Sequence, residues 1–575
     1  MAGRRPNFLF FIPDQLRADA LGAFGNPHVR TPHLDALAAR GTRFDNAFVQ
    51  HPVCSPSRAS FLTGWYPHTG GHRTLTHLLK PWEPNVLRGL KESGYHVVWP
   101  GMRGDTFAPG ATELSVDEYG FGVRPTTYPL PVTRETWPGG EEWARLYYRG
   151  RREDDAERVD ADEATVRTAE RWLTAPPADR PWALFVPLIA PHCPFEVEEP
   201  WFSMYDRDTM PDPVPAAAPT AAATTAREPA FMQAIRERFR ITETSPGMWR
   251  EVIATYYGMI SRMDGQLGRL VRALRDSGAE EDTVTFFFAD HGEYLGDYGL
   301  IEKWPSALHP CITRDPLVVS GGGLPAGQHT DAMVELIDIV PTILELAGTE
   351  PGYRQFGRSL LPLLRDPAGA HRAYAFTEGG FSREEEPQLE AAGFPYDLKA
   401  ALQHESPELV GRAIAVRDTE WTYVWRLYEP PELYHRTTDP HEVTNLAGRP
   451  GHAEVETRMQ QAVLHWLADT ADVIPTAEDP RYPSVDLPVP AGPPGPDGQV
   501  ERASEHLRRV MEHWARRQST DDGGGTTDDG DETTVDGDET ADDGDETAVV
   551  GSDDAADDGG DDKADVRSVP GGTRA

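Results

Sequence analysis

The stretch NFLFFIPDQ, from Asn7 to Gln15, contains an unbroken apolar run that ends at Pro13 and Asp14. A short continuous apolar run of this kind indicates a strand that is buried on both faces of a sheet. Similar runs recur along the chain and alternate with segments that have helical patterns. This alternation predicts an α/β fold, with a mostly parallel central sheet flanked by helices on both faces. The expected strands are residues 7–12, 97–99, 182–189, 283–288 and 316–319.

Three segments predict helices around this sheet. In TPHLDALAARG, Thr31 stands at the N-cap and Pro32 at the first helical position. Residues 248–270 and 339–347 have apolar residues at helical spacing, and Gly348 closes the second of these helices. These helices are expected to cover the apolar faces of the predicted sheet.

After about residue 370 the pattern changes. Residues 411–426, GRAIAVRDTEWTYVWR, hold two β-branched and aromatic runs with a turn between them, which is typical of an antiparallel hairpin. Residues 455–466 place apolar side chains on one helical face. We therefore expect a smaller C-terminal antiparallel sheet plus a helix. The expected domains are 1–370 (catalytic α/β), 371–485 (C-terminal α+β), 486–518 (linker and polar helix) and 519–575 (acidic tail).

The chain is strongly acidic, with 93 acidic residues against 55 basic ones and a formal net charge of −38. Nucleic acids and anionic membranes both require an excess of Lys and Arg, so neither is expected as a partner. Lysine occurs only five times, against fifty arginines. An acidic, lysine-poor chain resembles proteins that stay soluble in high salt. A halophilic habitat is therefore one hypothesis, and an acidic, arginine-using cytoplasmic protein is the other.

The acidic tail repeats the pentad DGDET from Asp529, Asp536 and Asp543. Because it contains almost no apolar residues, it lacks the means to form a core and is expected to be disordered. Two roles for it stay open: a solubilising appendage, and Ca²⁺ binding by the repeats.

The cysteines and the apolar segments indicate in which cellular compartment the protein is located. Cys54, Cys193 and Cys311 are too few and too scattered for a disulfide framework or a Cys-rich zinc site. The apolar run near the N-terminus is short and is followed by no small-residue cleavage site. No apolar segment reaches about 18 residues, the length that spans a membrane. These observations predict a cytoplasmic location.

One cysteine has an informative context: in VQHPVCSPSRASFLTGWYPHTGG, residues 49–71, Pro56 and Arg58 follow Cys54. This run resembles the signature of the type I sulfatases of the alkaline phosphatase superfamily, and the resemblance covers about residues 6–470. In that family the cysteine is oxidised after translation to formylglycine, by an enzyme that reads the cysteine, proline and arginine. The resemblance therefore implies formylglycine at position 54 and a formylglycine-generating enzyme as a partner during maturation.

The physical chemistry of this segment agrees with the resemblance. A nucleophile at residue 54, before a helix that starts near Ser55, holds an anion against unpaired backbone N–H groups and the positive end of the helix dipole. A sulfate or phosphate ester suits that position. Arg58, one turn along, is expected to neutralise charge near the nucleophile and to orient it.

A hydrolase of anionic esters also needs a cation, and hard cations take oxygen ligands. Asp14 and Gln15 follow the first predicted strand, and Asp290 and His291 follow the run TVTFFF. The resemblance makes these residues metal ligands together with the modified Cys54. Gln15 stands where most sulfatases have an aspartate, which resembles the choline-sulfatase and phosphonate-monoester-hydrolase branch. The family pattern implies Ca²⁺, with Mg²⁺ and Mn²⁺ as alternatives.

Further residues match substrate contacts of the family. His192, in LIAPHCPFEVEEP, corresponds to the histidine that protonates the leaving oxygen, and Lys303 corresponds to a lysine that binds the sulfate. The family's glycine-lysine-x-histidine motif is absent, and Arg103 stands there as a substitute positive charge for substrate binding. His72 and His77 are alternatives for the missing base, which the sequence leaves unassigned.

The sequence thus predicts a sulfatase that hydrolyses small-molecule sulfate esters through formylglycine and a divalent metal ion. Two alternatives stay open. One is a phosphonate monoester hydrolase or phosphodiesterase with the same architecture. The other is an unmodified, catalytically silent protein that binds anions.

Overall fold

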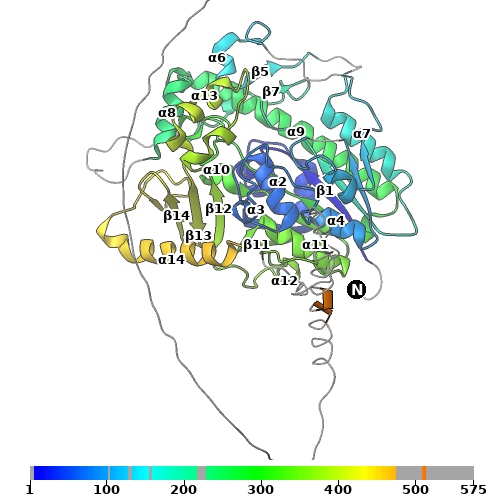
Figure 1. Cartoon of the computed structure of the whole chain (residues 1–575). Helices are drawn as coiled ribbons and strands as arrows, with labels where there is room; N and C mark the ends of the chain where they lie inside the picture. The colour runs from blue at the N-terminus through cyan, green and yellow to red at the C-terminus, as the bar shows by residue number, and fades with distance from the viewer. Residues whose placement is uncertain are drawn as a thin grey trace, which may run out of the picture. The chain divides into compact units, whose positions relative to one another are not determined.

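The computed structural model describes residues 5–101, 104–126, 133–153, 158–216, 228–473, 508–509 and 511–512. Their centre is a nine-stranded sheet whose main path runs β11-β2-β10-β8-β1-β6-β3-β4, with β9 paired to β2 (Figure 1). The neighbours β8, β1, β6, β3 and β4 are all parallel, whereas β10 runs antiparallel to both β8 and β2. The strands span Asn7–Ile12 (β1), Gly41–Phe48 (β2), His96–Pro100 (β3), Glu118–Gly120 (β4), Trp182–Pro187 (β6), Thr283–Phe287 (β8), Arg314–Asp315 (β9), Val318–Gly321 (β10) and Gln328–Glu335 (β11).

The five predicted strands are confirmed, with small shifts at their ends. β1 has the predicted bounds, β6 ends at Pro187, and β10 begins at Val318. The sequence pattern did not predict β2 and β11, which lie together at one end of the sheet. β2 carries polar residues such as Arg43 and Asp45 at partly exposed positions, and this mixture lacks the continuous apolar run of a central strand.

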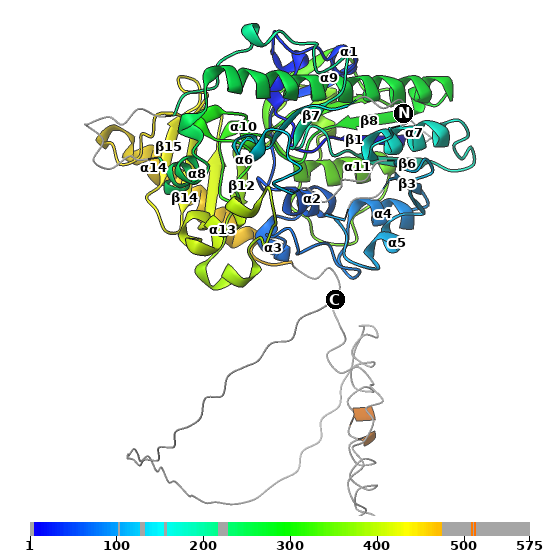
Figure 2. The same cartoon turned by 90° about the horizontal axis from the view of Figure 1, so that it is seen from above.

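Alternate residues of β1 enter two separate cores. Leu9 and Phe11 pack with α1, α7 and α9, whereas Phe8, Phe10 and Ile12 pack with α2, α4 and α11. Figure 2 shows α1 and α9 on one side of the sheet and α2, α4 and α11 on the other. Burial on both faces explains why the strand is apolar throughout. These helices span Pro32–Ala39 (α1), Cys54–Thr63 (α2), Val86–Glu92 (α4), Ala161–Leu173 (α7), Pro246–Asp276 (α9) and Ile339–Ala347 (α11).

The helix predictions are confirmed with differences at the ends. Thr31 is the N-cap residue of α1, but its hydroxyl donates to the Asp35 carboxylate at 3.0 Å instead of capping the backbone. α9 is longer than predicted at both ends: the Ser245 hydroxyl accepts a hydrogen bond from the Met248 N–H and starts the helix two residues earlier, and the helix continues to Asp276. α11 ends at Gly348, which adopts the left-handed conformation with φ 65°.

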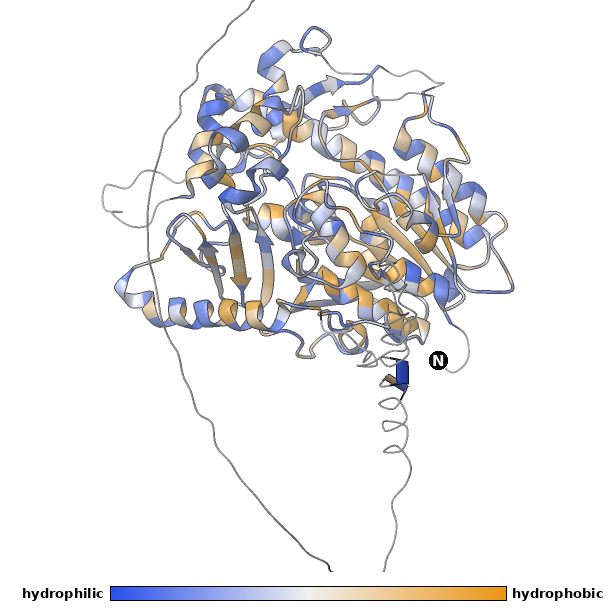
Figure 3. Ribbon diagram, in the orientation of Figure 1, coloured by the Kyte–Doolittle hydropathy of each residue, from blue (hydrophilic) through white to orange (hydrophobic). Residues whose placement is uncertain are grey.

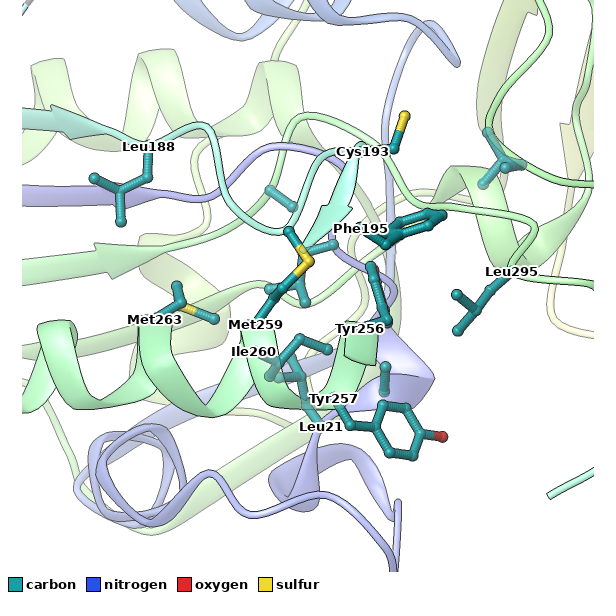
Figure 4. Packing of buried hydrophobic residues seen from close by; sticks show 14 of the residues in the cluster. Leu21, Leu188, Cys193, Phe195, Tyr256, Tyr257, Met259, Ile260, Met263 and Leu295 are labelled. Atoms are coloured by element: carbon teal, nitrogen blue, oxygen red, sulfur yellow. The ribbon is translucent and has the colours of Figure 1, made fainter. Parts of the chain in front are cut away.

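The long helix α9 packs against the segment that follows strand β6. Its Tyr256 meets Phe195 of β7 edge-on, with ring centroids 5.7 Å apart (Figure 4). β7, Phe195–Val197, pairs in parallel with β5, Tyr148–Arg151, in a separate two-stranded sheet. The loop that follows β6 is therefore anchored on α9 by aromatic packing.

The predicted C-terminal sheet and helix are also present. Four antiparallel strands, in the order β12-β13-β14-β15, form this sheet. α14, Ala453–Thr470, packs Met459 and Trp466 against Ile414 and Tyr423 of the sheet. Figure 3 shows the resulting alternation of apolar and polar residues along α14. The strands span Ala375–Gly379 (β12), Ala413–Arg417 (β13), Trp421–Arg426 (β14) and Glu432–His435 (β15).

Short helices complete the described part of the chain: Pro67–Gly70 (α3), Ala111–Ser115 (α5), Gly140–Ala144 (α6), Ala230–Arg238 (α8), Pro310–Thr313 (α10), Leu361–Arg365 (α12) and Asp397–Glu405 (α13). Among the described residues, no helix has the length and apolar character that crossing a bilayer requires. The predicted linker and polar helix (486–518) lie outside the described residues except for 508–509 and 511–512, and the tail (519–575) lies wholly outside them. The boundary at residue 370 stays a prediction.

Candidate active site

Three neighbouring parallel strands deliver the predicted site residues to one edge of the sheet. Asp14 and Gln15 follow β1, Asp290 and His291 follow β8, and His192 lies in the loop after β6. Since β8, β1 and β6 are adjacent and parallel, their carboxyl ends lie side by side. Open α/β sheets place their ligands at this edge.

The helix α2 brings Cys54 to the same edge. It begins at Cys54, next to the predicted start near Ser55, and all ten of its residues are buried. The Ser57 hydroxyl donates to the Asp290 carbonyl oxygen at 2.6 Å, which ties the first turn of α2 to the end of β8. The Cys54 sulfur lies 3.1 Å from Nε2 of His291. A residue about 240 positions earlier in the chain thus meets the end of β8.

Four donor groups converge there. One ligand atom each from Asp14, Cys54, Asp290 and His291 lies within 4.8 Å of the others, and all four side chains are buried. Burial lowers the pKa of His291, which favours the neutral ring that binds metals. Two carboxylates and a neutral imidazole beside Cys54 form a donor set that suits a divalent cation. These residues therefore fit the metal ion that the sequence implies.

Arg58 lies among these carboxylates and not in the open pocket. Its guanidinium is fully buried and lies 2.8 Å from Oδ2 of Asp290, 3.2 Å from Oδ2 of Asp14 and 3.5 Å from Oδ2 of Asp105. It offsets the charge of carboxylates that would otherwise repel one another at this distance. Arg58 thus positions the predicted metal ligands.

Gln15 occupies a constrained position between the metal-ligand cluster and the substrate side. Its backbone has a left-handed φ of 63°, its N–H donates to Oδ1 of Asp290, and its carbonyl accepts from the Tyr256 hydroxyl at 2.7 Å. Its side-chain amide donates to Glu293 and accepts from the Lys303 ammonium at 2.6 Å. A non-glycine residue keeps such a backbone conformation only where its surroundings hold it. These hydrogen bonds direct the side chain of Gln15 toward Lys303 and Glu293, and its role as a metal ligand stays a prediction.

A series of polar and charged side chains in contact with one another extends from Gln15 along the pocket. The Lys303 ammonium lies 2.9 Å from Nε2 of His192 and 2.8 Å from Oε1 of Glu302. The other oxygen of Glu302 lies 3.1 Å from the Lys399 ammonium. Glu302 thus balances two buried lysines, and Lys303 remains positively charged beside the ends of the strands.

The buried environment sets the protonation of these groups. Burial and then Lys303 lower the pKa of His192 to about 4, so its ring is neutral near pH 7. Burial opposes the charge on Glu302, but Lys303 and Lys399 lower its pKa to about 2. Burial and then Asp14 raise the pKa of the Cys54 thiol well above its usual range. An unmodified Cys54 would therefore be protonated and a weak nucleophile.

These groups lie at the floor of a pocket of about 540 Å³. The charged and polar part of its lining includes Cys54, His51, His192, Glu302, Lys303 and Lys399, together with Arg73, Thr74, Thr76, Gln388 and Glu390. The outer wall is largely apolar and includes Leu75, Phe381, Leu389, Ala391 and Tyr396. Most of that wall comes from residues 381–399, after β12, in the segment that the sequence assigned to a separate C-terminal domain. This segment covers the substrate side of the site.

Sequence reasoning missed several charged or polar residues of the pocket, among them His51, Glu302 and Lys399. His51 and Glu302 flank the predicted Cys54 and Lys303, so the signal was proximity in sequence to those residues. Lys399 lies almost a hundred positions away from Glu302. The only sequence feature that could have pointed to Lys399 was the scarcity of lysine in this chain.

The structure places the remaining predicted residues away from the pocket lining or leaves them undescribed. His72 is buried, and its ring nitrogens lie 2.7 Å from the His77 carbonyl oxygen and 3.1 Å from Glu83. Among the described residues that line the pocket, His72 and His77 are absent. Arg103 lies outside the described residues. The structure therefore gives no support to His72 or His77 as the missing base.

The parallel sheet, the buried donor cluster at its edge and the cysteine at the start of α2 define a hydrolase of the alkaline phosphatase superfamily. Within that superfamily, the family model named Sulfatase matches residues 6–349. The chain therefore belongs to the sulfatase family and is a sulfuric ester hydrolase.

Curated relatives agree with this family, and a solved structure shares its fold. The chain is 30% identical to a multifunctional alkaline phosphatase superfamily protein of Trinickia caryophylli, over 81% of this chain and 96% of that protein. It is 24% identical to the choline-sulfatase of Rhizobium meliloti, over 82% and 89% of the two chains. The phosphonate monoester hydrolase of Agrobacterium radiobacter has the same fold, with a TM-score of 0.62 and 24% identity, over 81% of this chain and 96% of that chain.

Proposed function

We propose that this protein hydrolyses the sulfate esters of small, largely apolar alcohols through a formylglycine made from Cys54. The observation that carries this proposal is the position of Cys54. It stands within the sulfatase signature, between the Asp14, Asp290 and His291 cluster and a pocket that contains Lys303.

The proposed reaction needs two groups that translation does not supply, formylglycine and a divalent cation. Formylglycine at position 54 would supply the oxygen nucleophile, and a divalent cation held by Asp14, Asp290 and His291 would make that oxygen more acidic. We propose Ca²⁺ as this cation, with Mg²⁺ and Mn²⁺ as the alternatives. Maturation would require a formylglycine-generating enzyme, which is the partner that the signature implies.

The side chains of the pocket have separate roles in this proposal. Lys303 binds the sulfuryl oxygens with its ammonium, which Gln15 and Glu302 hold in place at 2.6 and 2.8 Å. His192 moves the proton for the departing alcohol at Nε2, because its Nδ1 is already engaged with the carbonyl oxygen of Cys193. The Lys303 ammonium donates a hydrogen bond to that nitrogen at 2.9 Å and keeps its own proton and charge, so the proton that His192 delivers is taken up from solvent.

His51 adds a neutral hydrogen-bond donor. Its Nδ1 accepts the Val53 backbone N–H at 3.1 Å, so the proton of the neutral ring resides on Nε2. Nε2 is buried without a partner among the described residues, and the ring lines the pocket with Cys54. We assign His51 to donate to a substrate oxygen. The same tautomer excludes the neutral ring from the role of the missing base.

The apolar outer wall of the pocket is our basis for proposing the kind of alcohol that the sulfate ester contains. Leu75, Phe381 and Leu389 present apolar surface beyond the charged floor. A sugar needs many hydrogen-bonding partners, whereas an aryl or alkyl group gains from burial against such a wall. We therefore expect an uncharged aryl or alkyl sulfate to be preferred over a sulfated sugar.

A second reaction is favoured by one specific observation. Gln15 is neutral where most sulfatases have an aspartate, and this lowers the negative charge near the cation. The relative in Trinickia caryophylli is called multifunctional, and a phosphonate monoester hydrolase shares the fold. Phosphonate monoesters and phosphodiesters are therefore the alternative substrates. The ratio of kcat/KM on phenyl sulfate, phenyl phosphonate esters and phosphodiesters decides between the two functions.

The decisive experiment pairs peptide mass with turnover. The tryptic peptide that ends at Arg58 and contains residue 54 should show the mass of an aldehyde or its hydrate in active protein. Cys54→Ala should fold and lose turnover of sulfate esters by more than about 10³-fold, because it removes the nucleophile. Cys311→Ala is the matched control and should retain activity. Turnover by protein whose Cys54 is still a thiol contradicts the proposal, and an unmodified, inactive wild type supports the silent anion-binding alternative.

Two further expectations concern the setting of the reaction. We propose a cytoplasmic location, because the scattered cysteines form no disulfide among the described residues. The net charge of −38 with few lysines favours activity at high salt. Turnover that rises with NaCl into the molar range would support the halophilic hypothesis, and a monotonic fall would contradict it.

A further inference from the structure

A second cavity, of about 250 Å³, lies where the central sheet meets the C-terminal sheet. Its lining includes Phe48 at the end of β2, Arg314 of β9, Arg417 of β13, and Arg436 and Glu442 from the segment after β15. None of these residues lines the pocket at Cys54. We call it the arginine cavity.

The arginine cavity is positively charged within a chain of net charge −38. Three guanidinium groups face one carboxylate, and within the described ranges none of Arg314, Arg417 and Arg436 has a carboxylate oxygen within 4.0 Å. The neighbouring strand shows the usual arrangement, because the buried Arg426 forms an ion pair with Glu432. The arginines of this cavity thus lack the ion pair that the nearby buried Arg426 has.

Two of the three arginines, Arg417 and Arg436, are held by neutral groups instead. Arg417 is fully buried and donates to Oγ1 of Thr377 at 3.2 Å and to the Leu308 carbonyl oxygen. Arg436 donates to Oδ1 of Asn46 at 2.7 Å. The guanidinium carbons of Arg417 and Arg436 lie 4.9 and 5.3 Å from the centre of the Phe48 ring. Packing on this shared ring fixes the orientation of both groups before any ligand binds.

Several polar atoms around the arginine cavity have no partner in the described residues. Nε of Arg314, Nε of Arg417 and Oε1 of Glu442 are all buried without a hydrogen bond. Burial and the nearby Arg436 lower the pKa of Arg417 to about 10, although Glu442 acts in the opposite direction. A buried cation with free donors costs stability unless a counter-charge accompanies it. The arrangement thus calls for an anion with several acceptor oxygens.

We propose that the arginine cavity, formed by Arg314, Arg417 and Arg436 around Phe48, binds one small inorganic oxyanion, sulfate or phosphate. Guanidinium groups match the oxygen spacing of such anions and form paired hydrogen bonds with them. The bound oxyanion joins β2 and β9 of the central sheet to β13 of the C-terminal sheet. It stabilises the junction of the two sheets and takes no part in the reaction at Cys54.

The test measures thermal unfolding of the full chain as sodium sulfate is added at constant ionic strength. A ligand that binds only the folded state raises Tm in a saturable way, and we expect a rise of about 3 °C or more. Arg436→Gln should lose most of this rise, and Arg314→Gln, at a partly exposed position, serves if the first variant does not fold. Arg250→Gln is the matched control, because Arg250 pairs with Asp212 on the surface. The control should keep the full rise.

Sulfate also binds the proposed active site as the product, so its inhibition of turnover is measured in the same samples. We expect Arg436→Gln to keep the wild-type inhibition constant while losing the rise in Tm. Equilibrium dialysis with labelled sulfate should give one fewer bound ion in this variant than in the wild type. An equal rise in wild type and variant, or an equal rise with sodium chloride, overturns the proposal. A matching rise with phosphate supports it.

Discussion

The ammonium of Lys303 lies 2.9 Å from Nε2 of His192 and donates to Gln15 at 2.6 Å. One lysine therefore joins Gln15, which departs from the common sulfatase pattern, to His192, which we propose handles the proton of the leaving group. Because burial and Lys303 together keep His192 neutral, the positive charge resides on the lysine. This charge distribution is the basis of the first two predictions.

His192→Ala should slow esters with poor leaving groups far more than esters of activated phenols. A general acid matters only where the departing oxygen needs a proton, and such groups contribute about 10²- to 10⁴-fold. Turnover of an alkyl sulfate and of 4-nitrophenyl sulfate should therefore diverge by at least about tenfold in this variant. The exposed His28→Ala is the control. Equal losses on both esters would make His192 a positioning residue.

Glu302→Gln should destabilise the protein and impair catalysis together. It leaves the buried ammonium groups of Lys303 and Lys399 without their shared carboxylate, and breaking a buried pair in this way costs about 3 to 5 kcal/mol. The double variant Glu302→Gln/Lys399→Met removes one of the two charges and should recover part of that stability but not the activity. Urea unfolding of the wild type, Glu302→Gln, Lys399→Met and the double variant measures this coupling. Additive effects would show that the charges are independent.

Asp14→Asn and Asp290→Asn should each reduce the metal content of the purified protein. Each change removes a negative charge from the donor cluster, and hard cations depend on that charge. Asp45→Asn, at a partly exposed pair with Arg43, is the control. Elemental analysis after dialysis measures retention and identifies the ion, and excess Ca²⁺, Mg²⁺ or Mn²⁺ should restore part of the activity. Wild-type metal content in both variants would place the ion elsewhere.

The buried His309 should make the protein sensitive to acid. Burial, followed by Arg426 and Arg417, lowers its pKa to about 3, below the usual 6.5. The unfolded chain therefore binds more protons than the folded chain between about pH 6.5 and pH 3, and stability falls as the pH falls through this window.

His309→Gln should flatten this dependence. Between pH 6.5 and 5.5 the wild type should lose about 1 kcal/mol more of its free energy of unfolding than the variant, since one proton is worth about 1.4 kcal/mol per pH unit. Urea unfolding at both pH values measures the difference. The exposed His28→Gln should behave as the wild type. Parallel curves for wild type and His309→Gln would contradict the prediction.

The sequence by itself determined the central strands and the residues that follow them. β1, β8 and α11 have almost the predicted bounds, because each is encoded by apolar residues within a few positions of one another. Asp14, His192 and Asp290 follow predicted strands, and parallel topology makes their approach to one edge a consequence of the fold. The signature around Cys54 is local as well, and it was enough to indicate the family.

Only the tertiary structure decided which groups those residues meet. Lys303 and Gln15 are 288 positions apart, and no local pattern encodes their contact. The polar strand β2, the apolar wall from residues 381–399 and the arginine cavity all arise where distant segments pack together. A short apolar run specifies its own conformation through burial. The charge balance of Glu302 or Arg417 depends on partners that only the folded chain brings within reach.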